Sequence, residues 1–194
     1  MKKLLFMAAA LLTAGFANAQ ITYSLGYINT NWDVDYSGGD KTINGFTIGV
    51  DDNINLTGDL NVSAGLGMEL SFATFDGLLG ADWKYKEFGL FVPVDFNYGF
   101  ALSDNFKLSV FAGPTFNLGL MSKATHDSDT FNYYDEDDGN MGRFDILMGG
   151  GVWFDIQDQF RVKIGYKAGL MDTDKSDNIE RKSNVLSVSL GYIF

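Results

Sequence analysis

The sequence lacks cysteine and has only two prolines and one histidine. A chain without cysteine cannot depend on disulfide bonds for its stability outside the cytoplasm. Beyond its N-terminus the chain also lacks any run of about 20 apolar residues, the length that crosses a bilayer as a helix. These absences exclude a disulfide scaffold and a helical membrane protein.

Basic residues are scarce as well. The chain has 14 Lys and Arg against 25 Asp and Glu, a formal net charge of −11. Without Lys2 and Lys3, 12 basic residues would remain against 25 acidic ones, a net charge of −13. A nucleic-acid-binding protein needs a basic surface, so we expect no nucleic-acid partner.

Residues 1–19 have the pattern of a secretory signal peptide. Lys2 and Lys3 form its positive start, residues 4–12 are all apolar, and residues 17–19 form an Ala-Asn-Ala cleavage motif. The apolar run is too short for a membrane anchor. We predict an exported protein that begins at Gln20, with residues 20–194 forming one domain, as is usual for about 175 residues.

What the chain has in abundance is glycine, aromatic residues and a period of two. It contains 23 glycines, 17 phenylalanines and nine tyrosines. From Leu60 to Phe72 every even position is apolar and every odd position is polar or glycine. This alternation predicts a strand with one apolar and one polar face, longer than the 5–6 residues usual in globular proteins.

The same alternation predicts seven further strands. It recurs at 88–100, 106–120, 144–156, 160–170 and 186–194, and more weakly at 21–32 and 42–50. Short turns are expected at 102–105 and 157–159 and a longer one at 51–59, with long polar loops at 33–41, 73–82, 121–142 and 171–182. Short turns at one end and long loops at the other indicate an all-β, eight-stranded antiparallel up-and-down transmembrane β-barrel (a meander). The long loops would be extracellular and both termini periplasmic.

A soluble eight-stranded barrel also has alternating strands, and the placement of charge decides between the two. A soluble barrel carries its charges on the outside, whereas the polar face here consists mostly of Gly, Ser and Asn. Its charges are balanced, as in a confined lumen where each buried charge needs a partner. These predicted lumen charges are Glu69, Glu87, Asp95, Asp145 and Asp155 against Lys107, Arg143, Arg161, Lys163 and Lys167. Glycines on the same face would leave room for their long side chains.

A few residues break the pattern. Phe91, Leu147 and Trp153 occupy polar-face positions, so we expect apolar bulk inside the lumen. Proline removes a donor from the strand ladder. With a turn at 102–105, Pro93 is expected opposite Gly113 and beside Pro114, in one bulged patch.

The segments EFGLFVPVDFNYGF, FDILMGGGVWFD and the terminal LSVSLGYIF resemble the small outer-membrane β-barrel domain family common in Bacteroidota. More loosely, the chain is similar to eight-stranded barrels of the OmpA and OmpX type. The resemblance covers residues 20–194. It implies the barrel fold, a place in the cell outer membrane, and insertion by the barrel-assembly machinery, which in such proteins reads a terminal aromatic residue like Phe194. It implies no particular function.

No residue pattern predicts a catalytic site or a cofactor. His126 lies near Ser122, Asp127, Ser128 and Asp129, but in a loop that lacks the supporting shell a catalytic site needs. The acidic run at 135–139 does not have the ligand spacing of a calcium-binding loop. We interpret both segments as solvated loops.

Three functions remain open. The first is a non-enzymatic barrel with a side-chain-filled lumen, whose acidic loops contact the envelope or an external partner. The second is a narrow pore for small solutes, and the third is a lipid or peptide hydrolase with its site at the rim. We expect a monomer in contact with outer-membrane lipid and lipopolysaccharide.

Overall fold

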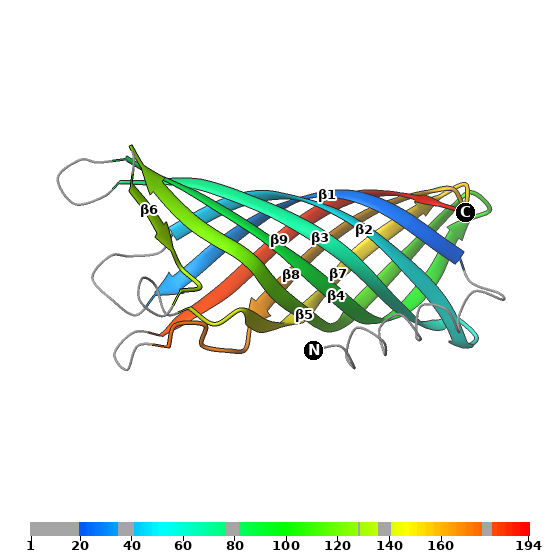
Figure 1. The fold of residues 1–194 in the computed structure, drawn as a ribbon. Helices are drawn as coiled ribbons and strands as arrows, with labels where there is room; N and C mark the ends of the chain where they lie inside the picture. Colours follow the sequence, from blue (N-terminus) through cyan, green and yellow to red (C-terminus); the bar gives the residue numbers. More distant parts are fainter. Residues whose placement is uncertain (1–19, 35–40, 77–81, 128, 136–140, 176–179) are drawn as a thin grey trace.

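The computed structural model describes residues 20–34, 41–76, 82–127, 129–135, 141–175 and 180–194. Each long strand pairs antiparallel with the next, and the last pairs with the first, so eight strands close into a barrel (Figure 1). A ninth, short strand, β6, pairs only with the end of β5. The strands are β1 (Gln20–Val34), β2 (Lys41–Thr57), β3 (Leu60–Asp76), β4 (Asp82–Ser103), β5 (Phe106–His126), β6 (Asp129–Asn132), β7 (Phe144–Ile156), β8 (Phe160–Gly169) and β9 (Arg181–Ile193). The predicted signal peptide lies outside the described residues.

The C-terminus and the short turns lie at one end of the barrel (Figure 1). The turns after β4 and β7 are those expected from the sequence. The expected longer turn at 51–59 is wrong, because β2 continues to Thr57 and only residues 58–59 separate it from β3. Gly58 takes a positive φ of 55°, which glycine adopts without steric cost.

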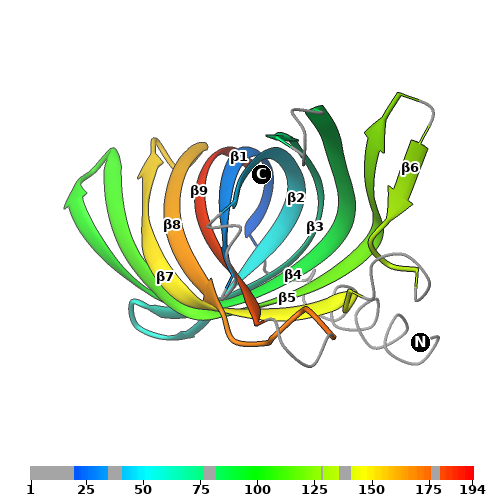
Figure 2. The same ribbon diagram turned by 90° about the vertical axis from the view of Figure 1, so that its left-hand side faces the viewer.

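The opposite end has an uneven height. β3, β4 and β5 extend beyond the other barrel strands, with β3 and β4 paired as far as Asp76 and Asp82, and β6 folds back along β5 (Figure 2). The prediction of one polar loop from Met121 to Gly142 is therefore wrong in part. At the end of β5 the outward positions hold Lys123 and Thr125, so no apolar outward row revealed this part of the strand.

The two prolines lie in one patch, but not in the predicted register. Pro93 pairs with Thr115, not Gly113, because the turn consists only of residues 104–105, so that Ser103 pairs with Phe106 and the β4–β5 pairing is displaced by two residues from the predicted one. The irregularity between Ala101 and Ser103 changes this pairing by only one residue. Pairing is interrupted beside each proline without a local register shift. The ladder is therefore broken here rather than bulged, since each proline lacks the N–H that would continue it.

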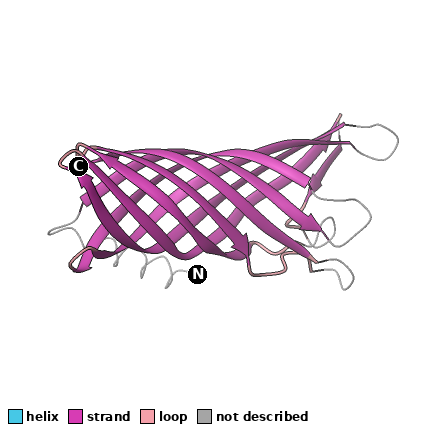
Figure 3. Ribbon diagram, turned by 180° about the vertical axis from the view of Figure 1, so that it is seen from behind, coloured by secondary structure: helices cyan, strands magenta, loops and turns pink. Residues whose placement is uncertain are grey.

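The outward face is apolar on every long strand. Its side chains include Leu25 (65% exposed), Phe46 (58%) and Leu190 (65%), which would be unusual on a surface facing water. Figure 3 shows the described chain as strands joined by loops and turns. Among the described residues, no helix is long and apolar enough to cross a membrane.

Glycines on the inner face give space to large side chains, as the sequence suggested. A Cβ at Gly67 would overlap the Phe91 ring, and one at Gly119 would overlap the Tyr134 hydroxyl. At Gly151 the obstacle is instead the backbone carbonyl of Ile164. The inner glycines therefore serve both side-chain packing and the close approach of neighbouring strands.

Single cysteines should report this two-faced arrangement, because the chain has none of its own. Cysteine at position 66, 90, 110 or 164 should react only with lipid-soluble thiol reagents, since Val110 and Ile164 face outward and are 44% and 42% exposed. Cysteine at 130 should react with impermeant reagents on whole cells. Position 176, for which we expect the same, lies outside the described residues.

Ser109→Cys is a matched control beside Val110, because Ser109 is buried in the lumen and should react with neither reagent. Labelling of 110 by the impermeant reagent would contradict the membrane orientation.

Candidate functional site: the lumen and its extracellular end

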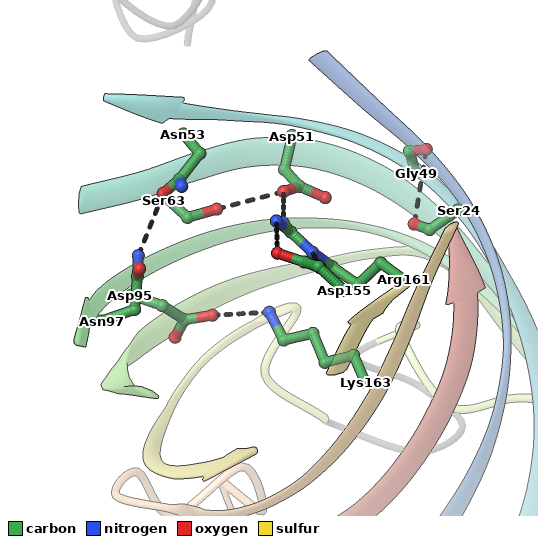
Figure 4. Close-up of polar contacts among 10 residues, drawn as sticks. All are labelled: Ser24, Gly49, Asp51, Asn53, Ser63, Asp95, Asn97, Asp155, Arg161 and Lys163. Carbon is green, nitrogen blue, oxygen red and sulfur yellow. Dashed lines mark hydrogen bonds and ion pairs between the residues drawn. The ribbon is translucent and has the colours of Figure 1, made fainter. Parts of the chain in front are cut away.

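A buried ion pair lies in the lumen near the short turns. The β7–β8 hairpin closes through the three-residue turn at 157–159 and places Asp155 opposite Arg161, which confirms the register predicted from the sequence. Arg161 donates to both carboxylate oxygens of Asp155, from Nε at 2.7 Å and from Nη2 at 3.0 Å. Asp51 of β2 lies 3.6 Å from Nη1 of the same guanidinium (Figure 4). Arg161 and Asp155 are only 4% and 6% exposed, so this pair is sealed from water.

Deeper in the lumen, one aspartate serves two lysines. Asp95 of β4 accepts from Lys163 at 2.9 Å and from Lys167 at 2.6 Å. Figure 4 shows Lys163 reaching across the lumen toward Asp95. Lys167 also donates to Thr115 at 2.8 Å. Asp95 is 1% exposed, and its two bonds connect β4 to β8 across the barrel.

Apolar side chains fill the space between these charges. Phe111 and Trp153 stack with their ring centroids 5.3 Å apart, and the Lys163 ammonium lies 4.3 Å from the Phe111 centroid. Trp153, Leu147 and Phe111 are 1%, 3% and 5% exposed. The alternation of the sequence predicted Trp153 and Leu147 on this face. Phe111 was not predicted there, although its odd position between Ser109 and Gly113 indicates the same face.

Carboxylates dominate the extracellular half of the lumen. Glu87 accepts hydrogen bonds from the Tyr85 and Tyr134 hydroxyls, each at 2.6 Å. Burial, and secondarily the Glu87 charge, raise the pKa of Tyr134, which keeps this hydroxyl protonated as a donor. Glu69 and Asp145 line the same small cavity of about 60 Å³.

An aromatic cluster lies above these carboxylates. Trp32, Ile43, Tyr85 and Met141 form a buried apolar group, with Phe75 and Tyr133 packed against it. The Arg181 guanidinium lies 4.6 Å from the Trp32 centroid and donates to the Thr173 hydroxyl at 2.9 Å. A second cavity, lower in the lumen, is about 130 Å³ and is lined by Phe91, Phe111 and the Asp95–Lys163–Lys167 group.

Three predicted site residues take no part in the ion pairs of the described residues. Lys107 sits on β5 opposite Asp155, packed against Gly99. Arg143 is exposed, but it lines the same extracellular cavity of the lumen as Glu69 and Asp145. It precedes β7, donates to the Leu120 carbonyl at 3.1 Å and stacks over Tyr134. The Phe194 ring packs against Tyr23 and Tyr192 on the outward face where the barrel closes.

The residues considered for catalysis are not brought together. The Ser122 hydroxyl is buried and hydrogen-bonded to Tyr85 at 2.8 Å. His126 lies four residues further along β5, about 13 Å away at the rise of a strand, with Nδ1 at 3.0 Å from the Asp82 carbonyl oxygen. Among the described residues, no three His, Asp or Glu side chains are placed to hold a metal ion. Residues 136–139 of the acidic run lie outside the described part.

Comparisons with known proteins agree with this architecture. Ail of Yersinia pestis is 16% identical, with a TM-score of 0.53 over 91% of this chain and 99% of that one. Neisserial surface protein A is 15% identical, with a TM-score of 0.54 over 90% and 97%. The outer membrane enzyme PagL is less similar, at 11% identity and a TM-score of 0.45 over 86% and 97%. No curated protein matches the chain in sequence.

Similarity at this level of identity shows the fold alone. The family comparison is more specific, because the model described as "Outer membrane protein beta-barrel domain" matches residues 4–194. The match covers all eight barrel strands and agrees with the apolar outward face and the enclosed polar lumen. The chain therefore belongs to the outer membrane protein β-barrel domain family and lies in the outer membrane.

Proposed function

We propose that this protein is a non-enzymatic surface barrel with a closed lumen, which acts through the face it presents outside the cell. The main support for this proposal is that side chains fill the lumen. Ion pairs join β4 to β8 and β2 to β8 across it, and the stacked Phe111 and Trp153 rings occupy the space between them. An eight-stranded barrel is only just wide enough to be filled by side chains.

Two observations favour this function over a hydrolase. The Ser122 hydroxyl is buried and bonded to Tyr85, so a substrate cannot reach it. His126 contacts a backbone carbonyl and the carboxylate of its neighbour Asp127, 3.6 Å away. Neither arrangement supplies a nucleophile activated by a nearby base.

The extracellular end offers a surface for interaction. An open aromatic cleft of about 350 Å³ lies on the raised wall of β3–β6 and is lined by Phe75, Trp83, Phe131 and Tyr133. Aromatic residues are common anchors in protein interfaces. A surface pull-down with the folded barrel would identify what binds there, with Trp83→Ala as the variant expected to lose it.

Conductance separates this proposal from the pore alternative. Folded protein in planar bilayers should show no steady single-channel current, because its lumen is filled. The double variant Phe111→Ala, Trp153→Ala should admit ions, since it removes the stacked rings. A matched control, Phe116→Ala with Phe154→Ala, removes two outward aromatic rings and should stay silent. A steady, sizeable current from the unmodified protein would support the pore.

A further inference from the structure

Three lysines gather on the outward face of the β4–β5 pair, beyond the extracellular edge of the apolar band. Lys86 pairs directly with Lys123, and Lys84 lies two residues further along β4, opposite Thr125. All three are exposed. None forms an ion pair with any residue in the described ranges.

This grouping carries an electrostatic cost inside the protein. Like charges directly opposite on paired strands destabilise the pair. The other cross-strand neighbours are uncharged: Thr74 beside Lys84, Phe72 beside Lys86 and Asn132 beside Lys123. Asp82 lies on the same face, two residues beyond Lys84 and further from the membrane. An anion bound from outside would relieve the repulsion between Lys86 and Lys123.

The height of the cluster indicates where that anion comes from. The outward apolar positions of β4 run from Phe88 to Phe100, about 30 Å at ~3.3 Å per residue and ~40° tilt. This length equals the hydrocarbon thickness of a bilayer, about 30 Å. Lys86 lies two residues beyond Phe88, about 5 Å higher along the membrane normal. The ammonium groups therefore sit at the level of the lipid headgroups.

We propose that Lys84, Lys86 and Lys123 bind the phosphate groups of a phosphorylated glycolipid in the outer leaflet. Lysine ammonium groups bind phosphate as point charges, and basic residues next to an anionic membrane surface strengthen attachment to it. The acyl chains of the same lipid lie against Phe72 and Phe88, directly below the cluster. This surface is independent of the lumen and goes beyond the function proposed above.

The chain offers a matched control. Lys182 of β9 is also on the outward face at the extracellular end, opposite Asp33. Its ammonium is 3.2 Å from a Glu180 carboxylate oxygen. A lysine that already lies next to acidic side chains should attract phosphate only weakly. Lys182 therefore tests whether any lysine at the extracellular rim is sufficient to bind the lipid phosphate.

The experiment measures retention of fluorescent lipid A by the folded protein in phosphatidylcholine nanodiscs. Lys86→Ser should weaken lipid retention about fivefold. The variant with serine at all three lysine positions should weaken it by on the order of 100-fold, because each lysine near the surface contributes a similar increment of binding free energy. Lys182→Ser should bind like the unmodified protein, and the triple arginine variant should retain binding. Heat-modifiable mobility on gels checks that every variant is folded.

Three outcomes would overturn the assignment. Equal retention of dephosphorylated lipid A would mean that acyl contacts alone hold the lipid. Unchanged retention by the folded triple serine variant would place the phosphate elsewhere. Tighter binding of soluble inositol hexakisphosphate or heparin, lost in the same variant, would mean that the lysines receive a soluble polyanion rather than a membrane lipid.

Discussion

Replacing Asp95 by alanine should lower the free energy of unfolding by about 3–5 kcal/mol. The substitution leaves the Lys163 and Lys167 ammonium groups, now 2.9 and 2.6 Å from the Asp95 oxygens, without a carboxylate partner. Their side chains are only 23% and 12% exposed, so water can compensate them only in part. Removing one partner of a buried pair is costly mainly because the other charge is stranded.

Urea unfolding in phosphatidylcholine vesicles, followed by the fluorescence of the three tryptophans, measures this loss. Asp104→Ala is the control, because Asp104 lies exposed in the turn between β4 and β5 and should change stability by less than about 0.5 kcal/mol. Adding Lys163→Met and Lys167→Met to Asp95→Ala should recover much of the loss, since no unpaired charge then remains in this group. If Asp95→Ala costs no more than Asp104→Ala, water solvates these lysines and the lumen is more open than the side chains indicate.

Arg161→Ala should cost about as much, roughly 3–5 kcal/mol, because it strands Asp155 in a site where that residue is 6% exposed. The double variant Asp155→Ala, Arg161→Ala should cost less than the sum of the two single variants, by about 1–3 kcal/mol. Two charge-assisted hydrogen bonds in a forked geometry account for this coupling. Asp51, whose oxygen is 3.6 Å from the guanidinium, should couple to Arg161 more weakly.

The coupling is measured by a double-mutant cycle in the same urea assay. The exposed Lys182–Glu180 pair provides the comparison, and its coupling should stay below about 1 kcal/mol. Additive losses at Asp155 and Arg161 would show that the ion pair contributes nothing to stability. Equal coupling in both pairs would show that the periplasmic end of the lumen admits water.

The β7–β8 and β4–β5 hairpins differ in how well the alternation of apolar and polar residues predicted their strand pairing. In the first, alternation on both sides of a short turn predicted the pairing of Asp155 with Arg161, and the structure has it. In the second, the turn lies at residues 104–105, closer to β5 than expected, so Ser103 pairs with Phe106 and Pro93 faces Thr115 instead of Gly113. The position of a short turn sets every later pair of its hairpin, and hydrophobic periodicity does not locate the turn to within one residue.

The raised extracellular wall was also hidden from the sequence. The end of β5 and all of β6 lack an apolar face turned to lipid, and their only apolar pair, Ala124 and Phe131, is too short to mark a strand by hydrophobicity. Their strand structure depends on pairing with β4 and β5 rather than on burial against the membrane. The same wall creates the lysine cluster, because Lys86 and Lys123 are 37 positions apart and meet only through this pairing.

The sequence by itself determined that long two-faced strands alternate with turns and loops, and that balanced charges share the polar face. These are local properties, since neighbouring side chains of a strand point to opposite sides whatever the strand pairs with. Only the tertiary structure decided which charges meet. Asp95 reaches Lys163 and Lys167 over separations of 68 and 72 residues, because closure of β9 onto β1 curves the sheet until β4 and β8 face each other across the lumen.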